Sequence, residues 1–216
     1  MMDTKIYDAI VIVTPADFKR VECNNQRIVE YLPVREVLFV GSEELKELVG
    51  QSNLGDKAGF VNENDIIPFD EVYNCMKDVM ADILLGRELP RGLVGWYYQQ
   101  FLKMKYSALC DDEYYMSWDG DTVPCKDFSM FDSEGRPYFD MKHEYHEEYF
   151  ITMETIMPSV KKLIDKSFIS EHMIFNSRYM KEMIEAIESN ENIKGTTFWE
   201  KILNSIRLEH IQENSF

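Results

Sequence analysis

The sequence is short of cysteine and of basic residues, and each shortage excludes a class of protein. Four cysteines occur in 216 residues, and no two of them form a C-x-x-C pair. A disulfide-stapled secreted scaffold is therefore disfavoured, and a reducing compartment is expected. Lysine and arginine together number 23 against 39 aspartates and glutamates, for a net charge of −16. Such a chain repels nucleic acid and anionic membranes on average, so an anionic ligand would need a metal ion or a few well-placed cations.

Long apolar runs are also missing. No stretch approaches the roughly 20 apolar residues of a transmembrane helix, and residues 1–8 lack the basic start and cleavage site of a signal peptide. We therefore expect a cytoplasmic protein without a transmembrane segment, for which peripheral association at the inner face of the membrane stays open. Neither G-x-G-x-x-G nor G-x-x-x-x-G-K-S/T occurs, which removes the main support for a dinucleotide site or a P-loop.

The spacing of apolar residues predicts alternating strands and helices. Residues 9–14 form a β-branched run that stops at Pro15, which is typical of a strand buried on both faces of a parallel sheet. We expect a single α/β domain over residues 1–216, with a mostly parallel, Rossmann-like central sheet flanked by helices. Further strands are expected over residues 34–40 and 114–118, residues 58–61 and 65–68 together suggest a short third strand, and residues 90–95 are expected to form a turn or loop. Helices are expected over residues 17–32, 43–49, 70–85, 96–109, 149–164, 177–188 and 198–206.

The only strict D-x-D motif in the chain follows the predicted strand over residues 114–118 directly. Asp119 and Asp121 flank Gly120, which lets the backbone turn. Open α/β sheets bind ligands at the carboxyl ends of their strands, where two carboxylates can hold Mg²⁺ or Mn²⁺ while the ion grips two phosphates. We therefore predict Asp119 and Asp121 as metal ligands, with Trp118, Asp119 and Gly120 at the diphosphate. A solvated acidic turn is the alternative.

Polar residues also follow the first predicted strand, at the same edge of the sheet. Thr14 or Asp17 can hydrogen-bond a base or ribose there, and Lys19 or Arg20 can approach phosphates, whereas capping of the next helix by Asp17 is the alternative. On the aromatic helix predicted over residues 96–109, a lysine and a glutamine are candidates for phosphate and sugar contacts. The predicted ligand-binding residues on these two segments are Thr14, Pro15, Ala16, Asp17, Arg20, Gln99 and Lys103.

A carboxylate and an imidazole are neighbours at Glu171 and His172, in an otherwise apolar stretch. Burial there would shift the proton affinities of both groups, as is common for catalytic residues. We predict Glu171 as the base that deprotonates an acceptor hydroxyl, with His172 orienting it or touching the sugar. In a retaining reaction Glu171 would instead stabilise positive charge on the sugar ring, and a structural pair is the alternative. His143 and His146 lack H-E-x-x-H spacing, so acceptor contacts from His146 or Tyr145 are preferred to zinc binding.

Five motifs occur in an order that resembles one family. They are GWYYQQFLK at residues 95–103, YYMSWDGDTVP at 114–124, EYH with YF within 144–150, FISEHMIF at 168–175 and FW at 198–199. Together they resemble a group of bacterial glycosyltransferases similar to the GT-A enzymes of capsule and lipopolysaccharide synthesis. The resemblance covers nearly the whole chain. It implies a GT-A fold, a hexosyltransferase-type activity, a nucleoside-diphosphate sugar donor with UDP favoured, a carbohydrate or lipid-linked acceptor, and Mn²⁺ or Mg²⁺.

One departure from that family concerns the end of the chain. The family implies an acidic and aromatic segment of the type S-E-x-E-x-Y-G just where the sequence stops at Phe216. We expect that either the chain is truncated or this member lacks the segment, which leaves metal or acceptor contacts missing. Two other functions stay open. One is a sugar-phosphate nucleotidyltransferase, which is disfavoured because no glycine-rich basic loop follows the first strand. The other is a non-catalytic carbohydrate-binding protein on the same fold.

Overall fold

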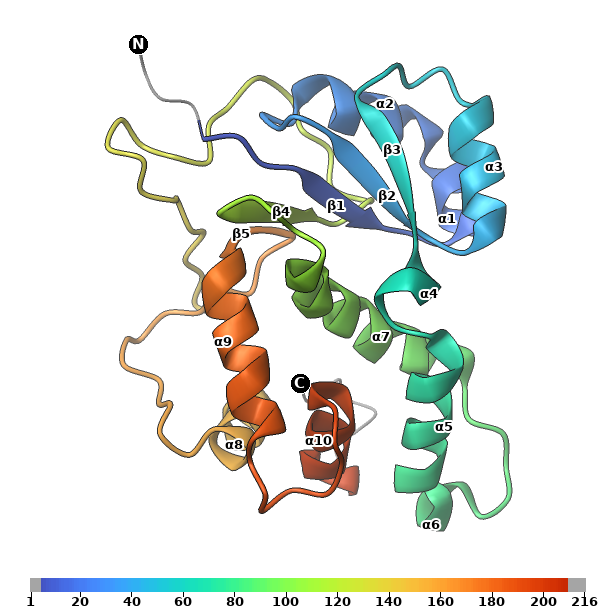
Figure 1. Ribbon diagram of the computed structural model, residues 1–216, viewed down its shortest axis with the longest axis vertical. Helices are drawn as coiled ribbons and strands as arrows, with labels where there is room; N and C mark the ends of the chain where they lie inside the picture. Colours follow the sequence, from blue (N-terminus) through green and yellow to red (C-terminus); the bar gives the residue numbers. More distant parts are fainter. Residues whose placement is uncertain (1–4, 210–216) are drawn as a thin grey trace.

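A five-stranded sheet forms the centre of the protein, and the computed structural model describes residues 5–209 (Figure 1). The strands lie in the order β3-β2-β1-β4-β5. Strands β1 to β4 pair in parallel, and β5 runs antiparallel to β4. The prediction of a single α/β domain with a mostly parallel sheet is confirmed, and the arrangement is compatible with a Rossmann-like fold. The strands span Ala9–Ile12 (β1), Val37–Gly41 (β2), Ala58–Asn62 (β3), Tyr114–Trp118 (β4) and His172–Asn176 (β5).

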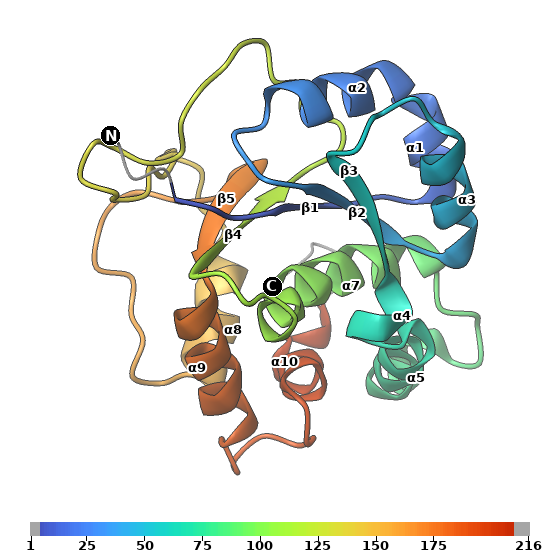
Figure 2. The ribbon, with the colours of Figure 1, turned by 45° about the horizontal axis from the view of Figure 1, so that its top comes forward.

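Both faces of the sheet are covered, because side chains along each inner strand alternate between two hydrophobic clusters. On β1, Ala9 and Val11 belong to one cluster and Ile10 to the other, and all three are fully buried. A continuous apolar strand is what burial on both faces requires. The first face is covered by α1 (Pro15–Arg20), α2 (Glu22–Tyr31) and α3 (Glu43–Gln51), and α7 (Arg91–Lys105) runs along the second (Figure 2).

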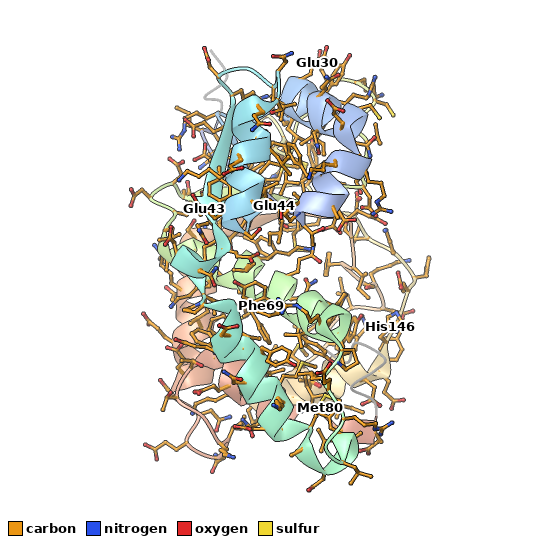
Figure 3. The ribbon with its side chains drawn as sticks, turned by 90° about the vertical axis from the view of Figure 1, so that its right-hand side faces the viewer. Glu30, Glu43, Glu44, Phe69, Met80 and His146 are labelled. Carbon is orange, nitrogen blue, oxygen red and sulfur yellow. The ribbon has the colours of Figure 1, made fainter. Side chains whose placement is uncertain are left out.

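The remaining helices lie on the same side of the sheet as α7, and two of them reach the sheet itself, α4 at β2 and β3 and α9 at β5. Farther from the sheet, α10 packs against α5, α8 and α9, and Phe198 and Ile202 are completely buried. In Figure 3, Phe69 lies at the end of α5 nearest the sheet, and Met80 lies beyond the far end. These helices are α4 (Glu63–Ile66), α5 (Phe69–Val79), α6 (Ala81–Leu84), α8 (Glu147–Ile156), α9 (Ser177–Glu188) and α10 (Phe198–Ser205), with a 3₁₀ turn, η1, at Tyr106–Ala108 after α7.

Two of the predicted helices are divided in the structure. The helix predicted over residues 17–32 consists of α1 and α2, because Val21 leaves helical geometry with φ −112° and ψ 32°. Thr14, not Asp17, is the N-cap of α1. The helix predicted over residues 70–85 is likewise α5 followed by α6, which ends where Leu85 adopts the left-handed conformation with φ 49°.

Local polar contacts and prolines explain two further differences. Residues 65–68 were predicted as part of the third strand but do not belong to β3, because the Asn62 side chain accepts a hydrogen bond from the Asn64 amide and so starts α4. The helix predicted over residues 149–164 ends at Ile156, since Met157 precedes a proline and such residues are disfavoured in helical geometry.

The sequence also gives no sign of strand β5, and it misplaces the start of α7. Strand β5 is short and begins and ends with polar residues, and its extended state depends on antiparallel pairing along the whole of β4. Pro90 was expected within a turn over residues 90–95, but it is the N-cap of α7, which begins at Arg91. Within the described residues 5–209, no helix is both long and apolar enough to cross a membrane.

The chain reverses its direction of travel across the sheet at β1. It first adds β2 and β3 on one side of β1, and after α4 to α7 it returns to add β4 on the other side. Because β1 and β4 are parallel, their carboxyl ends meet at one edge of the sheet. Such a switch point is where open α/β sheets form ligand crevices, so the topology itself selects the ends of β1 and β4 as the place to look for a site.

Gly120, just after β4, is needed for the close packing of these two strand ends. A Cβ atom at this position would lie 2.6 Å from Cγ1 of Val13, and the branched valine side chain has little freedom to move aside. We expect Gly120→Ala to destabilise the protein by about 1–3 kcal/mol, the usual cost of overpacking. Urea unfolding measures this change.

The matched control is Gly50→Ala in α3, where an added Cβ meets nothing within 4 Å. This substitution should leave stability unchanged or raise it by up to about 1 kcal/mol, because alanine favours helix. Equal urea midpoints for the Gly120 and Gly50 variants would contradict the packing argument.

Candidate functional site

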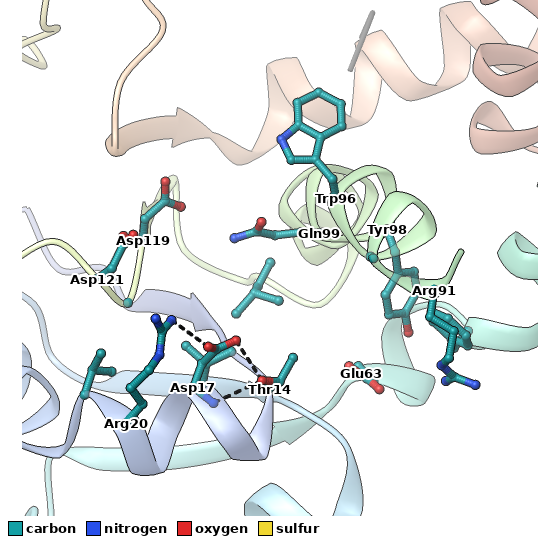
Figure 4. Close-up of a pocket in the computed structure, with 17 residues that line it drawn as sticks. Thr14, Asp17, Arg20, Glu63, Arg91, Trp96, Tyr98, Gln99, Asp119 and Asp121 are labelled. Carbon is teal, nitrogen blue, oxygen red and sulfur yellow. Dashed lines mark hydrogen bonds and ion pairs between the residues drawn. The ribbon is translucent and has the colours of Figure 1, made fainter. Parts of the chain in front are cut away.

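A cleft of about 750 Å³ opens at the carboxyl ends of β1 and β4 (Figure 4). We call it the main cleft. One wall comes from β1 and α1, another from the turn after β4, and a third from the start of α7. It therefore lies where the topology predicts a crevice. Its lining includes Thr14, Asp17, Arg20, Glu63, Phe69, Arg91, Trp96, Tyr98, Gln99, Asp119, Gly120 and Asp121.

The β1 wall is held by a compact hydrogen-bond network. The Thr14 hydroxyl accepts a bond from the Asp17 amide (3.1 Å) and donates to the Asp17 carboxylate (2.7 Å). The other carboxylate oxygen of Asp17 accepts from the Arg20 guanidinium at 2.7 Å. The predicted residues Thr14, Asp17 and Arg20 are thus brought together, as the dashed lines in Figure 4 show. Asp17 is already occupied by internal partners, whereas the Arg20 side chain is largely exposed and retains free donors.

The β4 wall is a tight turn that carries the two aspartates. The Thr122 amide donates to the Asp119 carbonyl at 2.9 Å, and the Trp118 indole donates to the Thr122 carbonyl at 2.8 Å. Asp121 is exposed on this turn, and within residues 5–209 its carboxylate has no hydrogen bond or ion pair. It is therefore available to a ligand or an ion in the main cleft.

Asp119 differs from Asp121 because a lysine already binds it. The Lys103 ammonium donates to the Asp119 carboxylate at 2.9 Å, and the lysine side chain is only 15% exposed. The Tyr115 hydroxyl on β4 donates to the Lys103 carbonyl at 2.7 Å and so fixes α7 against the sheet. As the structure stands, Lys103 neutralises Asp119 and does not face a phosphate site directly.

The donor set fits a metal ion that is shared with a substrate. Among residues 5–209 no three His, Cys, Asp or Glu side chains are grouped to hold a metal ion. Mg²⁺ bound with nucleotides commonly takes one or two carboxylates and completes its shell with phosphate oxygens and water. Asp121, with Asp119 beside it, meets that requirement, but a closed all-protein cage does not exist here.

The charge of the main cleft also favours binding of a divalent cation. Four acids line it, and two of them are paired, Asp17 with Arg20 and Asp119 with Lys103. The other two are Glu63 and Asp121, and Arg91 is the remaining cation of the lining. A bare diphosphate would meet net repulsion from this lining, whereas a divalent cation would be attracted. The cleft therefore suits a cation together with an anion better than an anion alone.

The far end of the main cleft was not foreseen from the sequence. The Arg91 guanidinium lies over the Phe69 ring, 4.7 Å from its centroid. Burial raises the pKa of Glu63, and Arg91 opposes that shift. The Tyr98 hydroxyl donates to the Ile67 carbonyl at 2.6 Å, which ties α7 to the segment after α4. Pro90 is a signal in the sequence for the start of a helix. A helix that begins at Arg91 would have placed this arginine at the edge of the cleft.

A second pocket of about 310 Å³ adjoins the main cleft and shares Trp96 and Asp119 with it. We call it the side pocket. The Asp119 amide donates to the Glu171 carbonyl at 2.9 Å, which continues the β4–β5 ladder and brings Glu171 next to the D-x-D turn. Its lining includes Trp96, Gln100, Lys103, Asp119, Tyr149, Phe168, Ser170, Glu171 and His172.

Glu171 is not buried, contrary to expectation. Its side chain is 54% exposed, and the Lys142 ammonium contacts both carboxylate oxygens at 2.9 Å. The hydrogen bond from Lys142 is the main cause that lowers the pKa of Glu171 below its ordinary value. Glu171 lies in a bend just before β5, where its carboxylate reaches solvent and Lys142.

His172 lies partly buried between two groups that the sequence did not connect to it. Its ring is tilted against the Trp118 ring with centroids 4.9 Å apart, and its Nε2 lies 3.7 Å from the Asp140 carboxylate. The Ser170 hydroxyl contacts the same carboxylate at 3.4 Å. Asp140 was missed because it belongs to the long loop between β4 and α8, 32 positions before His172.

Several predicted site residues lie outside both pockets. Trp118 is 4% exposed and packs on the α1–α3 face of the sheet, because a strand directs it away from the cleft. Pro15 and Ala16 belong to the first turn of α1 and do not line the main cleft. The remaining three have other partners: Lys19 pairs with Glu44 at 3.5 Å, His146 contacts Glu144 at 2.9 Å, and the Tyr145 ring stacks on Phe150.

Fold and site together define an α/β protein with a two-part polar cleft at its topological switch point. Residues 5–213 match the model of a family described as "Family of unknown function (DUF6492)". The chain therefore belongs to the DUF6492 family. No curated protein matches it. The acidic and aromatic segment that the family resemblance implies would begin where the sequence stops at Phe216, outside the described residues 5–209.

The ion pair between Lys142 and Glu171 makes a prediction about proton affinity. We expect the pKa of Glu171 to lie below its ordinary value in the wild-type protein and to rise toward that value in Lys142→Met. The pair persists at neutral pH and is lost as the pH falls through the lowered pKa, because protonation removes the charge that Lys142 binds. Carbon-13 NMR titration of the glutamate carboxyl groups measures both values.

The control is Lys46→Met, which removes an equivalent exposed pair with Glu43 on α3. That variant should leave the Glu171 titration unchanged. A Glu171 pKa that does not move in Lys142→Met would refute the assigned pairing.

Proposed function

We propose that this protein is a metal-dependent glycosyltransferase with a GT-A-type fold. It would move a sugar from a nucleoside-diphosphate sugar, UDP being favoured, to a glycan or lipid-linked acceptor of surface polysaccharide synthesis, in the cytoplasm or at the inner face of the membrane. The observation that carries the proposal is the position of Asp119 and Asp121. They lie on a turn at the switch point of the sheet, between a large cleft and a second pocket.

The main cleft would bind the donor. Asp121, assisted by Asp119, would hold Mn²⁺ or Mg²⁺, which as a Lewis acid stabilises the charge on a leaving diphosphate. Arg20 and Arg91 are the cations that line this cleft, and they would approach the phosphates. Thr14 and Asp17 lie on the β1 side, where base or ribose contacts are expected in such a crevice. Gln99 lines the same cleft and offers an amide to the sugar.

The side pocket would bring the acceptor to the donor sugar across Asp119. In the reaction the bond from the sugar C1 to the diphosphate oxygen breaks, and its electron pair leaves with the nucleoside diphosphate. An acceptor hydroxyl oxygen forms the new bond to C1 and gives its proton to Glu171 or, through His172, to solvent. Lys142 keeps Glu171 ionised, so the carboxylate is ready to accept a proton, although the same contact weakens it as a base.

A second candidate is a non-catalytic carbohydrate-binding protein on the same fold. It is favoured by the two ion pairs, because Lys103 neutralises Asp119 and Lys142 neutralises Glu171. In that case both carboxylates would be structural, and the pockets would bind sugar without cleaving it. Donor hydrolysis in the presence of Mn²⁺ separates the two candidates.

Replacing Asp121 tests the donor site directly. We expect UDP and Mn²⁺ together, but neither alone, to raise the melting temperature of the wild-type protein. At a ligand concentration about 100 times Kd the stabilisation is about 2.7 kcal/mol. In Asp121→Ala this joint stabilisation and any donor turnover should be lost. The unliganded melting temperature should barely change, because the side chain is exposed and unpaired.

Asp127→Ala is the matched control, since Asp127 is another exposed aspartate a few residues along the same loop. It should retain the wild-type response to nucleotide and metal. Other nucleoside diphosphates are screened beside UDP. The proposal fails if sugar transfer or donor hydrolysis is undiminished in Asp121→Ala, or if no nucleoside diphosphate stabilises the wild-type protein with Mn²⁺.

A further inference from the structure

The side pocket is electrically compensated, which distinguishes it from the main cleft. Its two carboxylates, Asp119 and Glu171, each pair with a lysine at 2.9 Å, Lys103 and Lys142 respectively. A charged ligand would gain no uncompensated partner there. Carboxylates paired in this way still have lone pairs that accept hydrogen bonds from hydroxyl groups. The pocket thus favours a neutral ligand rich in hydroxyl groups.

Aromatic rings and an amide complete this chemistry. Trp96, Tyr149 and Phe168 line the side pocket together with Gln100. Within residues 5–209 the Gln100 amide has no hydrogen-bond partner, so its donors and its acceptor are free for a ligand. Aromatic faces that alternate with hydrogen-bonding groups suit a sugar ring, which has an apolar C–H face and polar edges.

The aromatic lining continues outside the pocket. Phe168 is 41% exposed, and its ring contacts the ring of Phe139, which is 46% exposed, at a centroid distance of 5.9 Å. We call these two residues the aromatic ridge. A pair of backbone hydrogen bonds between Lys142 and Ser167, each 2.9 Å, holds the two loop segments side by side. The ridge is therefore a fixed apolar surface that begins at the pocket wall and extends away from it.

The size of the side pocket decides how much of a ligand it can hold. About 310 Å³ is at the low end for ligand pockets, which run from about 300 to 1,000 Å³. We take one sugar ring to occupy this space, so that a second unit of the same chain lies outside it. The aromatic ridge offers such a continuation, because Phe168 lines the pocket and Phe139 lies against it outside.

We propose that the side pocket and the aromatic ridge bind the acceptor as a neutral oligosaccharide of at least two units. The reacting unit lies in the pocket with a hydroxyl at Glu171 and Asp119, and the next unit packs on Phe168 and Phe139. The role of the saccharide as an acceptor rests on the proposed function, but its binding does not require donor or metal. The ridge makes the protein selective for an acceptor chain over a free monosaccharide.

Ligand-observed saturation-transfer NMR tests the proposal without any donor. The probes are methyl glycosides of glucose, galactose, mannose and N-acetylglucosamine, each beside disaccharides of the same sugar. At least one disaccharide should bind the wild-type protein about fivefold more tightly than its methyl glycoside, which is the scale of one aromatic contact. In Phe139→Ala that advantage should disappear while binding of the methyl glycoside stays the same. In Gln100→Ala both should weaken.

Tyr179→Ala is the control, because Tyr179 is an exposed aromatic residue on α9 that lines neither pocket. It should bind every probe as the wild-type protein does. Phe139 is exposed, so its replacement should leave the melting temperature unchanged. The melting temperature of each variant is measured before its saccharide binding is compared with that of the wild-type protein. The proposal is overturned if no disaccharide binds, or if the disaccharide advantage survives in Phe139→Ala.

Two other results distinguish saccharide binding from the proposed transferase activity and from membrane binding. Saccharide binding with no nucleotide response in any variant would remove the proposed transferase activity and leave the saccharide site standing. The wild-type protein could instead float with vesicles of anionic phospholipid and bind no saccharide. If Phe139→Ala then abolished flotation, the proposal would be overturned in favour of a membrane contact.

Discussion

The pairing of β4 with both of its neighbours is the constraint on which the rest of the site depends. Its parallel pairing with β1 brings the D-x-D turn to the end of β1, and the close approach of Gly120 to Val13 seals that junction. Its antiparallel pairing with β5 continues to the hydrogen bond from Asp119 to Glu171. One strand thus places the main cleft on one side of Asp119 and the side pocket on the other.

Two lysines then set the chemistry of these neighbouring spaces. Lys103 and Lys142 neutralise one carboxylate each, and Asp121 is left exposed without a hydrogen-bond or ion-pair partner among residues 5–209. The two spaces therefore differ in charge, because both carboxylates of the side pocket are paired whereas Asp121 in the main cleft is exposed. The difference follows from where the two lysines reach, since each of them binds a carboxylate of the side pocket.

Much of the sheet and part of the site could be predicted from the sequence. Residues 9–14 and 114–118 are apolar enough to indicate buried strands, and polar residues at or after the end of such a strand indicate a crevice. The exposed state of Glu171 could not be predicted, since Lys142 lies 29 positions away and reaches it only through the bridge between the loop segments. Strand β5 and the role of Asp140 were missed for the same reason, because both depend on long-range pairing.

The sequence by itself determined the α/β class, the parallel core strands and the placing of Asp119 and Asp121 at a strand end, because local hydrophobic periodicity and chain direction are written in adjacent residues. Only the tertiary structure decided which polar groups face one another. In the folded protein Trp118 is buried in the core, Asp119 forms an ion pair with Lys103, and Asp121 is exposed and unpaired among residues 5–209. The tertiary structure also joined Arg91 to the main cleft and placed Phe139 beside Phe168. Those outcomes depend on the packing of segments far apart in the chain, which no local pattern specifies.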